Sequence, residues 1–152
     1  MSAPGADAMV TLREITAETI DHMLKLSVTE PQQKLVATNA VSIAQAHFNK
    51  HAWFRAIYAD ETPVGFVMLC IDEKKAEYDL WRLMIDQRYQ RYGYGRKAVE
   101  QVIDDVRQLP NATVMRVSYV PIEGNPSPFY TRLGFVETGE WDDDEKIMQL
   151  VL

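Results

Sequence analysis

The sequence predicts a mixed α/β domain in which helices flank a central sheet. Two observations lead to this prediction. An apolar strand at 78–86 precedes a glycine-bearing turn at 90–96 and a helix whose apolar residues recur every three or four positions. With a parallel return strand at 114–119, these segments form one right-handed crossover unit. Two segments rich in aromatic and branched residues, 53–59 and 64–71, enclose a turn-forming stretch and indicate a hairpin.

The N-terminal third adds one strand and two helices. We expect a short strand at 10–13, a helix capped by Thr16 and interrupted by Pro31, and a second helix from about residue 39 to residue 48. The residues that we expect on the buried face of the second helix are Val41, Ala44 and Phe48. This segment therefore precedes the hairpin as a pair of helices.

A short helix with marked ends and two final strands complete the chain. Asn125 is a good N-cap, Pro126 suits the first helical position, and Gly134 favours the helix end. Strands follow at 134–140 and 146–152. The expected fold is a central mixed, mostly antiparallel sheet of six to seven strands flanked by four helices.

Length and composition predict one domain. The 152 residues, 47% of them apolar, are enough for one core, which we expect to span 9–152 after a disordered leader at 1–8. Cys70 is the single cysteine, so no internal disulfide forms. Because it lies within the apolar segment 64–71, we expect a small buried side chain rather than a catalytic thiol.

The charge and the apolar segments limit the partners. A net charge of −6 disfavours nucleic acid and suits a cationic ligand, although solubility alone would also explain it. No segment approaches the roughly 18 to 20 apolar residues of a membrane span, and the N-terminus lacks the regions of a signal peptide. We therefore expect a cytoplasmic protein with no membrane or nucleic-acid partner.

The turn at 90–96 is suited to bind an anion. The following helix begins near Tyr94, and its first amide groups lack intrahelical acceptors and carry the positive end of the helix dipole. Gly93 and Gly95 have no Cβ, so a phosphate can approach the backbone closely. The residues of this predicted anion site are Gln90, Arg91, Tyr92, Gly93, Tyr94, Gly95 and Arg96.

A dinucleotide-binding turn would share part of this pattern, since Gly93, Gly95 and Ala98 fit G-x-G-x-x-A. That site needs an acidic residue about 20 residues further on, at the end of the next strand. The next strand, at 114–119, has no acid, and too little chain remains for a doubly wound sheet. A Rossmann domain is therefore excluded, whereas a turn without a ligand stays an alternative.

Two motifs together resemble the Gcn5-related N-acetyltransferase (GNAT) superfamily over most of the chain. They are Q-x-x-G-x-G from Gln90 and N-x-x-x-x-Y-x-x-x-G-F from Asn125. The resemblance implies that 90–96 hold the pyrophosphate of acetyl-coenzyme A (acetyl-CoA), that Asn125 contacts the coenzyme, and that Tyr130 protonates the departing thiolate. The residues whose backbone it assigns to the pantetheine are Leu83, Met84 and Ile85. A phenol, with a pKa of about 10, stays neutral and can donate that proton.

The acceptor amine also needs a base, because an alkyl ammonium has a pKa of about 10.4 and is unreactive until it loses a proton. The position at which the family most often has a glutamate falls near Trp81, which cannot serve. Glu77 and Asp79 share one strand face with Trp81, so either acid is a candidate, acting directly or through water. A solvated carboxylate is the alternative for each.

The resemblance to the GNAT fold implies that the segment 29–45, between the first two helices, roofs the acceptor pocket. This segment resembles the bacterial spermine/spermidine acetyltransferase subgroup, in which Q-x-x-F-V-A-x-N and S-x-A-Q-A recur, with Leu35 in place of the aromatic residue. The candidate acceptor-binding residues are Glu30, Gln32, Asn39 and Trp81. The acidic stretch 137–145 is either a solvated turn or a rim that attracts polyamines.

These features predict an acetyl-CoA-dependent N-acetyltransferase without a metal. The amine, a polyamine such as spermidine or spermine, would attack directly in a ternary complex. Other small amines, amino acids, aminoglycosides and protein N-termini stay open as acceptors, and a non-catalytic acyl-CoA-binding domain is the competing class. The final strands could pair across a two-fold axis, so a homodimer is also open.

Overall fold

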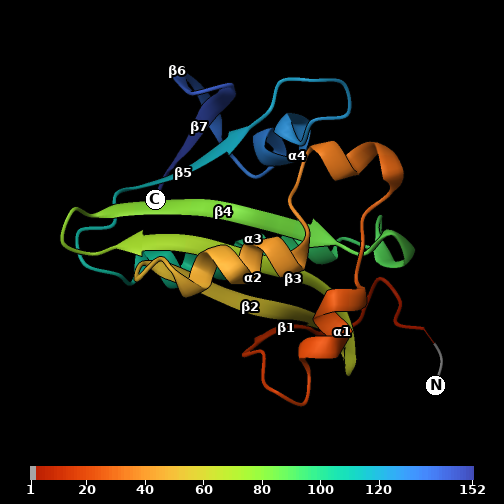
Figure 1. Ribbon diagram of the computed structural model, residues 1–152. Helices are drawn as coiled ribbons and strands as arrows, with labels where there is room; N and C mark the ends of the chain where they lie inside the picture. Colours follow the sequence, from red (N-terminus) through yellow and green to blue (C-terminus); the bar gives the residue numbers. More distant parts are fainter. Residues whose placement is uncertain (1–2) are drawn as a thin grey trace.

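A seven-stranded sheet runs through the computed structural model, which describes residues 3–152 (Figure 1). The strand order is β1-β2-β3-β4-β5-β7-β6, and only the β4–β5 pair is parallel. The strands are β1 (Val10–Arg13), β2 (Ala52–Ala59), β3 (Thr62–Asp72), β4 (Glu77–Ile85), β5 (Val114–Tyr119), β6 (Val136–Asp142) and β7 (Glu145–Val151). The predicted mixed, mostly antiparallel sheet is confirmed.

Helices cover both faces of the sheet. The α-helices are α1 (Ile20–Lys25), α2 (Asn39–His47), α3 (Tyr94–Arg107) and α4 (Ser127–Arg132), and the 3-10 helices are η1 (Glu30–Lys34) and η2 (Gln87–Tyr89). Figure 1 shows α3 behind the sheet and α1 and α2 in front of it. The part of the chain that the structure describes contains no helix with the length and apolar character needed to cross a membrane.

Each face of the sheet has its own core, because successive strand residues point to opposite sides. Ile57, Val67 and the buried face of α3 lie in one core, whereas Phe66, Met68 and Met23 of α1 lie in the other. The apolar face predicted for α3 is confirmed by the burial of its members Ala98, Val99, Val102, Ile103 and Val106.

The buried face of α2 differs from the prediction. Val41 and Ala44 are exposed, and Phe48 is 87% exposed. The helix turns Asn39 and Ser42 inward instead. The Asn39 amide donates to the carbonyl of Met23 at 2.9 Å, which ties the start of α2 to α1. Ile43 and Ala46 pack on the core from the same face, so the inward face of this helix combines two polar and two apolar residues.

The start of the chain also differs from the expected disordered leader. The Tyr94 hydroxyl donates to the carbonyl of Gly5 at 2.6 Å, and the Lys97 ammonium donates to that of Ala6 at 2.9 Å. Ala8 is buried in the core under α3. Residues 5–8 are thus held against α3, while residues 1–2 lie outside the described part of the chain.

The sheet opens between β4 and β5. The register of β4 against β3 shifts between the pairs Leu69–Leu80 and Met68–Arg82, which leaves Trp81 as the extra residue of a β-bulge. Just before the bulge, β4 and β5 pair only at Asp79–Arg116 and Leu80–Val117. Beyond these pairs the two strands diverge (Figure 1), so their facing backbone groups are free to bind a ligand.

The two outer strands of the sheet are β1 and β6. On β6, the side chains of Val136 and Trp141 are more than half exposed. An edge strand carries unpaired backbone groups that can pair with another chain. The homodimer through the final strands stays a prediction.

Asp86 holds the end of β4 to the segment that follows α1. Its buried carboxylate accepts hydrogen bonds from the backbone amide of Ser27 at 2.9 Å, the Arg88 amide at 3.0 Å and the Arg88 guanidinium at 2.8 Å. Burial alone would raise the pKa of Asp86, but the bonds from Arg88 and Ser27 together hold this pKa below its usual value.

We expect Asp86→Asn to lower the free energy of unfolding at pH 7 by about 1–3 kcal/mol, because buried donors lose a charged acceptor. A lowered native pKa means that the stabilisation is fully present above the unfolded value of about 3.9 and is lost as the pH falls through the native value. Urea unfolding of both proteins should therefore give curves that converge below about pH 4. A difference that stays constant with pH would contradict this account.

Candidate active site

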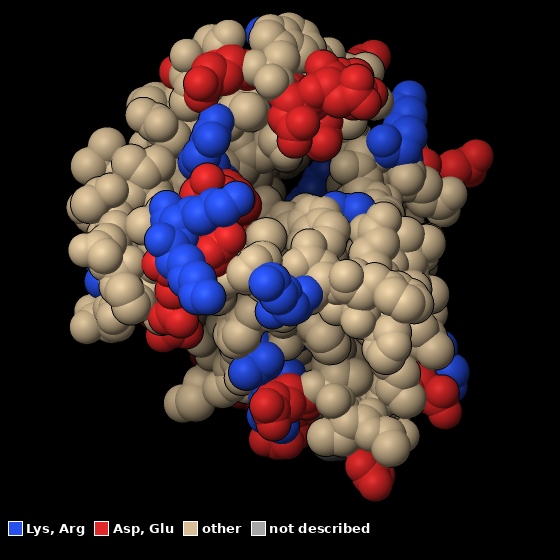
Figure 2. Space-filling view, turned by 60° about the vertical axis from the view of Figure 1, so that its left-hand side comes forward, with Lys and Arg blue, Asp and Glu red and all other residues tan. Residues whose placement is uncertain are grey.

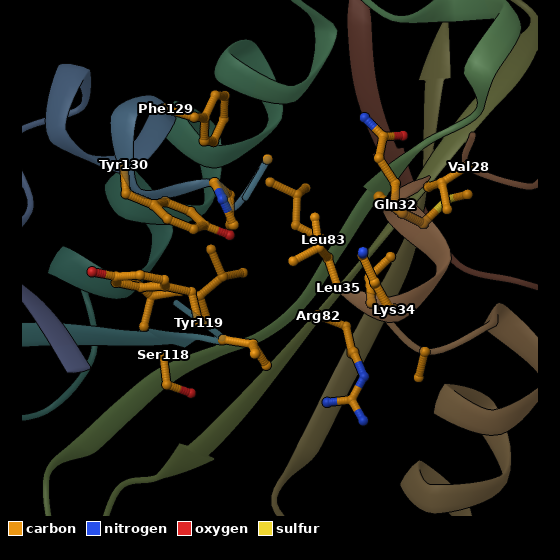
Figure 3. A pocket seen from close by; sticks show the side chains of 18 of the residues that line it. Val28, Gln32, Lys34, Leu35, Arg82, Leu83, Ser118, Tyr119, Phe129 and Tyr130 are labelled. Carbon is orange, nitrogen blue, oxygen red and sulfur yellow. The ribbon is translucent and has the colours of Figure 1, made fainter. Parts of the chain in front are cut away.

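A cleft of about 550 Å³ fills the gap between β4 and β5. Its walls come from the diverging ends of these strands, the segment around η1, α4, and the β6–β7 hairpin (Figure 3). The lining residues that matter for the chemistry are Gln32, Lys34, Trp81, Arg82, Leu83, Met84, Ile85, Gln90, Phe129, Tyr130, Asp144 and Glu145. Figure 2 shows the hollow in the surface, with acidic side chains along part of its rim.

Tyr130 points its hydroxyl into the cleft, toward Leu83 on the opposite wall (Figure 3). The residue is 6% exposed, and its ring packs edge-on against Phe129 and Phe135 at centroid distances of 5.2 and 5.6 Å. Burial raises the pKa of Tyr130 well above its usual range. The phenol therefore stays protonated at neutral pH, as a proton donor must.

The ends of α4 hold Tyr130 in place. The Asn125 side chain accepts from the Ser127 amide at 2.9 Å and donates to the carbonyl of Ile122 at 2.8 Å. At the other end, Gly134 adopts φ 103° and the Phe135 amide donates to the Tyr130 carbonyl at 3.0 Å. Asn125 does not line the cleft, and its contact with the coenzyme stays a prediction.

A second cavity, of about 380 Å³, lies at the N-terminus of α3. It shares the lining residues Ile85, Gln90, Gly95 and Phe129 with the cleft, so the two cavities adjoin, and we call the pair the groove. The charged side chains that line it are Arg91, Arg96 and Arg132. These cations line the same cavity as the start of α3, so this end of the groove is suited to an anion.

Gly93 makes the helix start at this point. It has φ 83°, a conformation that other residues rarely adopt, and α3 begins with the next residue, Tyr94, as the sequence predicts. The ring of Tyr94 is buried under α3, whereas Tyr92 stacks on it at 5.5 Å and lies outside the cavity lining. From the predicted anion site 90–96, the cavity is thus lined mainly by backbone and arginine side chains, and the binding of an anion there stays a prediction.

Gln90 and Gln32 join the two halves of the groove. The Gln90 amide group donates to the carbonyl of Ile85 at 2.9 Å and to the Gln32 side chain at 2.8 Å, and Gln32 donates in return at 3.2 Å. One residue was assigned to the coenzyme and the other to the acceptor. Their contact links the η1 segment to the anion-binding turn.

The two predicted bases lie outside this cleft. Asp79 lines an adjoining cavity of about 450 Å³, which meets the cleft at Trp81 and Ser118. Burial raises the pKa of Asp79, and the charge of Arg116 opposes this effect. Glu77 is exposed and lines neither cavity. The β-bulge places Trp81, not an acid, at the wall between the cavities.

The predicted acceptor residues divide in the same way. Gln32 and Trp81 line the cleft. Glu30 is exposed on η1 and lies outside the lining. Asn39 is buried at the start of α2, where it bonds to Met23, and it also lies outside the lining. Asn39 therefore has a structural position, and Glu30 faces solvent.

Charged residues that no sequence motif singled out also line the cleft. Arg82 donates to the Gln45 side chain at 3.0 Å, while its Nε is buried without a partner among the described residues. Burial lowers the pKa of Arg82, and Glu145 opposes this effect. Burial raises the pKa of Glu145, Asp144 adds to the shift, and Arg82 opposes it. Only the acidic composition of 137–145 hinted at such a role.

Several known proteins with a similar sequence or fold are acetyltransferases. The chain is 26% identical over 149 residues to the spermine/spermidine N(1)-acetyltransferase of Bacillus subtilis (strain 168), covering 91% of this chain and 96% of the relative. A crystal structure of an acetyltransferase from Thermus thermophilus has a TM-score of 0.75 at 14% identity, covering 95% and 97% of the two chains.

A PaiA N-acetyltransferase from Thermoplasma acidophilum, solved in complex with coenzyme A, has a TM-score of 0.66 at 16% identity, covering 95% of this chain and 99% of that one. Residues 18–135, which include β4, the anion-binding turn and α4, match the acetyltransferase (GNAT) family. The chain therefore belongs to the acetyltransferase (GNAT) family and is an N-acetyltransferase.

Proposed function

We propose that this enzyme moves the acetyl group of acetyl-CoA to a primary amine of a polyamine, such as spermidine or spermine. The observation that carries the proposal is the position of the β6–β7 hairpin, whose carboxylates Asp144 and Glu145 line the same cleft as Tyr130. The relationship to the Bacillus subtilis spermine/spermidine enzyme supports it. A polycation gains from several carboxylates at once, whereas a monoamine gains from one.

The groove accounts for the coenzyme along its length. Its anion-binding end, with Arg91, Arg96 and Arg132 around the start of α3, suits the pyrophosphate. The backbone edge of 83–85 suits the pantetheine amides, because it has no partner on β5, although the Ile85 carbonyl already accepts from the Gln90 side chain. A thioester reached from that edge would lie near the Tyr130 hydroxyl (Figure 3).

The residues then support direct transfer. The free amine attacks the thioester carbonyl, a carbon–nitrogen bond forms, the carbon–sulfur bond breaks, and Tyr130 gives its proton to sulfur. Burial of Tyr130 by itself opposes the loss of its proton, but the same low-polarity surroundings also disfavour a free thiolate, so the two effects offset each other and the transfer to sulfur stays possible. Cys70 does not line the cleft, which agrees with a reaction that uses no acetyl-cysteine intermediate.

An amino acid is the second candidate acceptor, because Arg82 and Lys34 line the cleft as well. The Arg82 guanidinium carries donors of the kind that pair with a carboxylate. Such an acceptor would carry its amine and its carboxylate into the same cleft. Coenzyme A release with a panel of polyamines, monoamines and amino acids separates the two candidates.

We expect spermidine and spermine to be better acceptors than monoamines of similar length, with the preference expressed mainly in the Michaelis constant of the acceptor. Added salt should weaken the preference, since it screens the outlying charges first. Initial rates of coenzyme A release at low and high ionic strength measure this. Polyamines no better than simple primary amines at low salt would rule out the polyamine assignment and leave acetyl transfer intact.

We expect Gly93→Val to raise the dissociation constant of acetyl-CoA strongly, because a branched residue disfavours φ 83° and narrows the approach to the α3 amides. Gly139→Val is a matched control. Gly139, on β6, has φ 80° and the same open space around its Cβ position. Calorimetric titration should show weaker binding only for the Gly93 variant, and equal affinity in both folded variants would remove the anion site.

Tyr130→Phe should lower turnover by roughly ten- to a thousand-fold with little change in either Michaelis constant, as expected for one positioned proton donor. Tyr119→Phe is the comparison variant. Tyr119 also lines the cleft, but its hydroxyl points away and donates to Glu137 (Figure 3). Its turnover should therefore fall much less. Steady-state kinetics that show wild-type turnover for Tyr130→Phe would remove Tyr130 from the mechanism.

A further inference from the structure

We propose that Glu145 is the general base that accepts the proton of the acceptor ammonium. The proposal rests on acetyl transfer to an amine and holds for either acceptor class. It replaces Glu77 and Asp79, the acids that the sequence favoured. Glu145 would then act on the same bound pair of substrates as Tyr130, from a different element of the fold.

Position is the first argument. Among the described residues, the carboxylates that line the main cleft are Asp144 and Glu145, and Tyr130 lines the same cleft from α4. Asp79 reaches only the adjoining cavity, and Glu77 reaches neither. A general base must come within hydrogen-bond reach of its proton or act through one water. The hairpin acids thus line the cavity that Tyr130 lines, whereas the acids at the start of β4 do not.

Backbone pairing distinguishes the two hairpin acids. Glu145 is the first residue of β7 and pairs with Asp142 of β6, so the sheet fixes its backbone. Asp144 lies in the turn before β7 and is more exposed than Glu145. A base held by a regular element keeps its geometry better than one in a turn. Glu145 is therefore the better placed of the two.

The charges around Glu145 suit a base at neutral pH. Arg82 on β4 and Lys34 on η1 are the cations that line the cleft with it. The acids of its own hairpin that raise its pKa are Asp142, Asp143 and Asp144, while Glu137 and Glu140 lie further back on β6. Burial and the neighbouring acids raise the pKa of Glu145, while Arg82 opposes them. Arg82 is itself bonded to Gln45 and to the carbonyl of Trp81. It can moderate the basicity of Glu145 from there without occupying its oxygens.

The proton balance of the transfer is complete with these groups. The ammonium gives its first proton to the Glu145 carboxylate, which releases it to solvent through the open side of the cleft. The neutral amine then attacks, the carbon–sulfur bond breaks, and sulfur takes the Tyr130 proton. The second proton from nitrogen restores the phenol by way of solvent. The products are the acetamide, the free thiol and one released proton.

Glu145→Gln tests the proposal through the pH dependence of kcat/KM for the acceptor with the highest turnover in the amine panel. At pH 7 the variant should lose about 10²- to 10⁴-fold. Because only amine that is already neutral can react in the variant, its kcat/KM should rise about tenfold per pH unit toward the amine pKa of about 10. The wild-type enzyme should reach a plateau at much lower pH, so the two profiles converge at high pH.

Asp143→Asn is the matched control. It removes the same charge from the same hairpin, Asp143 does not line the cleft, and asparagine tolerates its φ of 55°. This variant should keep the wild-type profile, even if the Michaelis constant of the acceptor rises. Thermal unfolding of each variant verifies that it is folded.

Two results would overturn the assignment. One is a Glu145→Gln profile parallel to that of the wild type, with the same loss at every pH, because a structural role lowers the rate without moving the profile. The other is the expected profile shift in Asp79→Asn instead, which would return the role to β4. If no amine in the panel is acetylated by the wild-type enzyme, the acceptor assignment fails first, and that outcome is visible before any variant is made.

Discussion

The early end of pairing between β4 and β5 is the constraint on which the site depends. After Asp79–Arg116 and Leu80–Val117 the strands separate, and the bulge at Trp81 begins at the same level. A continuous ladder here would satisfy the backbone of 81–85 and fill the space with packed side chains. The separation instead leaves free backbone groups on one strand and opens a cleft that α4 and the β6–β7 hairpin border. Binding groups and reacting groups thus meet because one sheet is incomplete.

The coenzyme half and the acceptor half of the groove must also keep a fixed relative position, and polar contacts between them provide this. Asp86 binds the segment after α1 to the end of β4, and the Gln32–Gln90 pair binds η1 to the anion-binding turn. Both contacts lie at the end of β4. Movement of the η1 segment would therefore displace the turn that precedes α3. The acceptor side and the coenzyme side of the groove are thus both attached to the end of β4.

The sequence predicted most of what depends on local pattern. The start of α3 at Tyr94 and its buried face follow from glycine positions and helical periodicity, and both are confirmed. The buried face predicted for α2 was wrong, because the true inward face carries the polar residues Asn39 and Ser42 beside the apolar Ile43 and Ala46. Asp79 was placed on the correct strand, but its cavity depends on a bulge and on the distance between strands. The position of Glu145 depends on how the last hairpin folds back, which no local signal records.

The order of the chain divides the chemistry between two regions. Between β4 and α3, the groups suited to the coenzyme are mainly backbone amides and carbonyls, together with arginine side chains. Backbone groups keep their positions when many side chains change. After β5 come Tyr130 on α4 and Glu145 on β7, whose side chains themselves carry protons. Changes in the last two strands can therefore alter the acceptor and the base without disturbing the coenzyme end. Local pattern located these last strands closely, but their place beside the cleft, on which the proposed acceptor and base depend, comes from the tertiary fold.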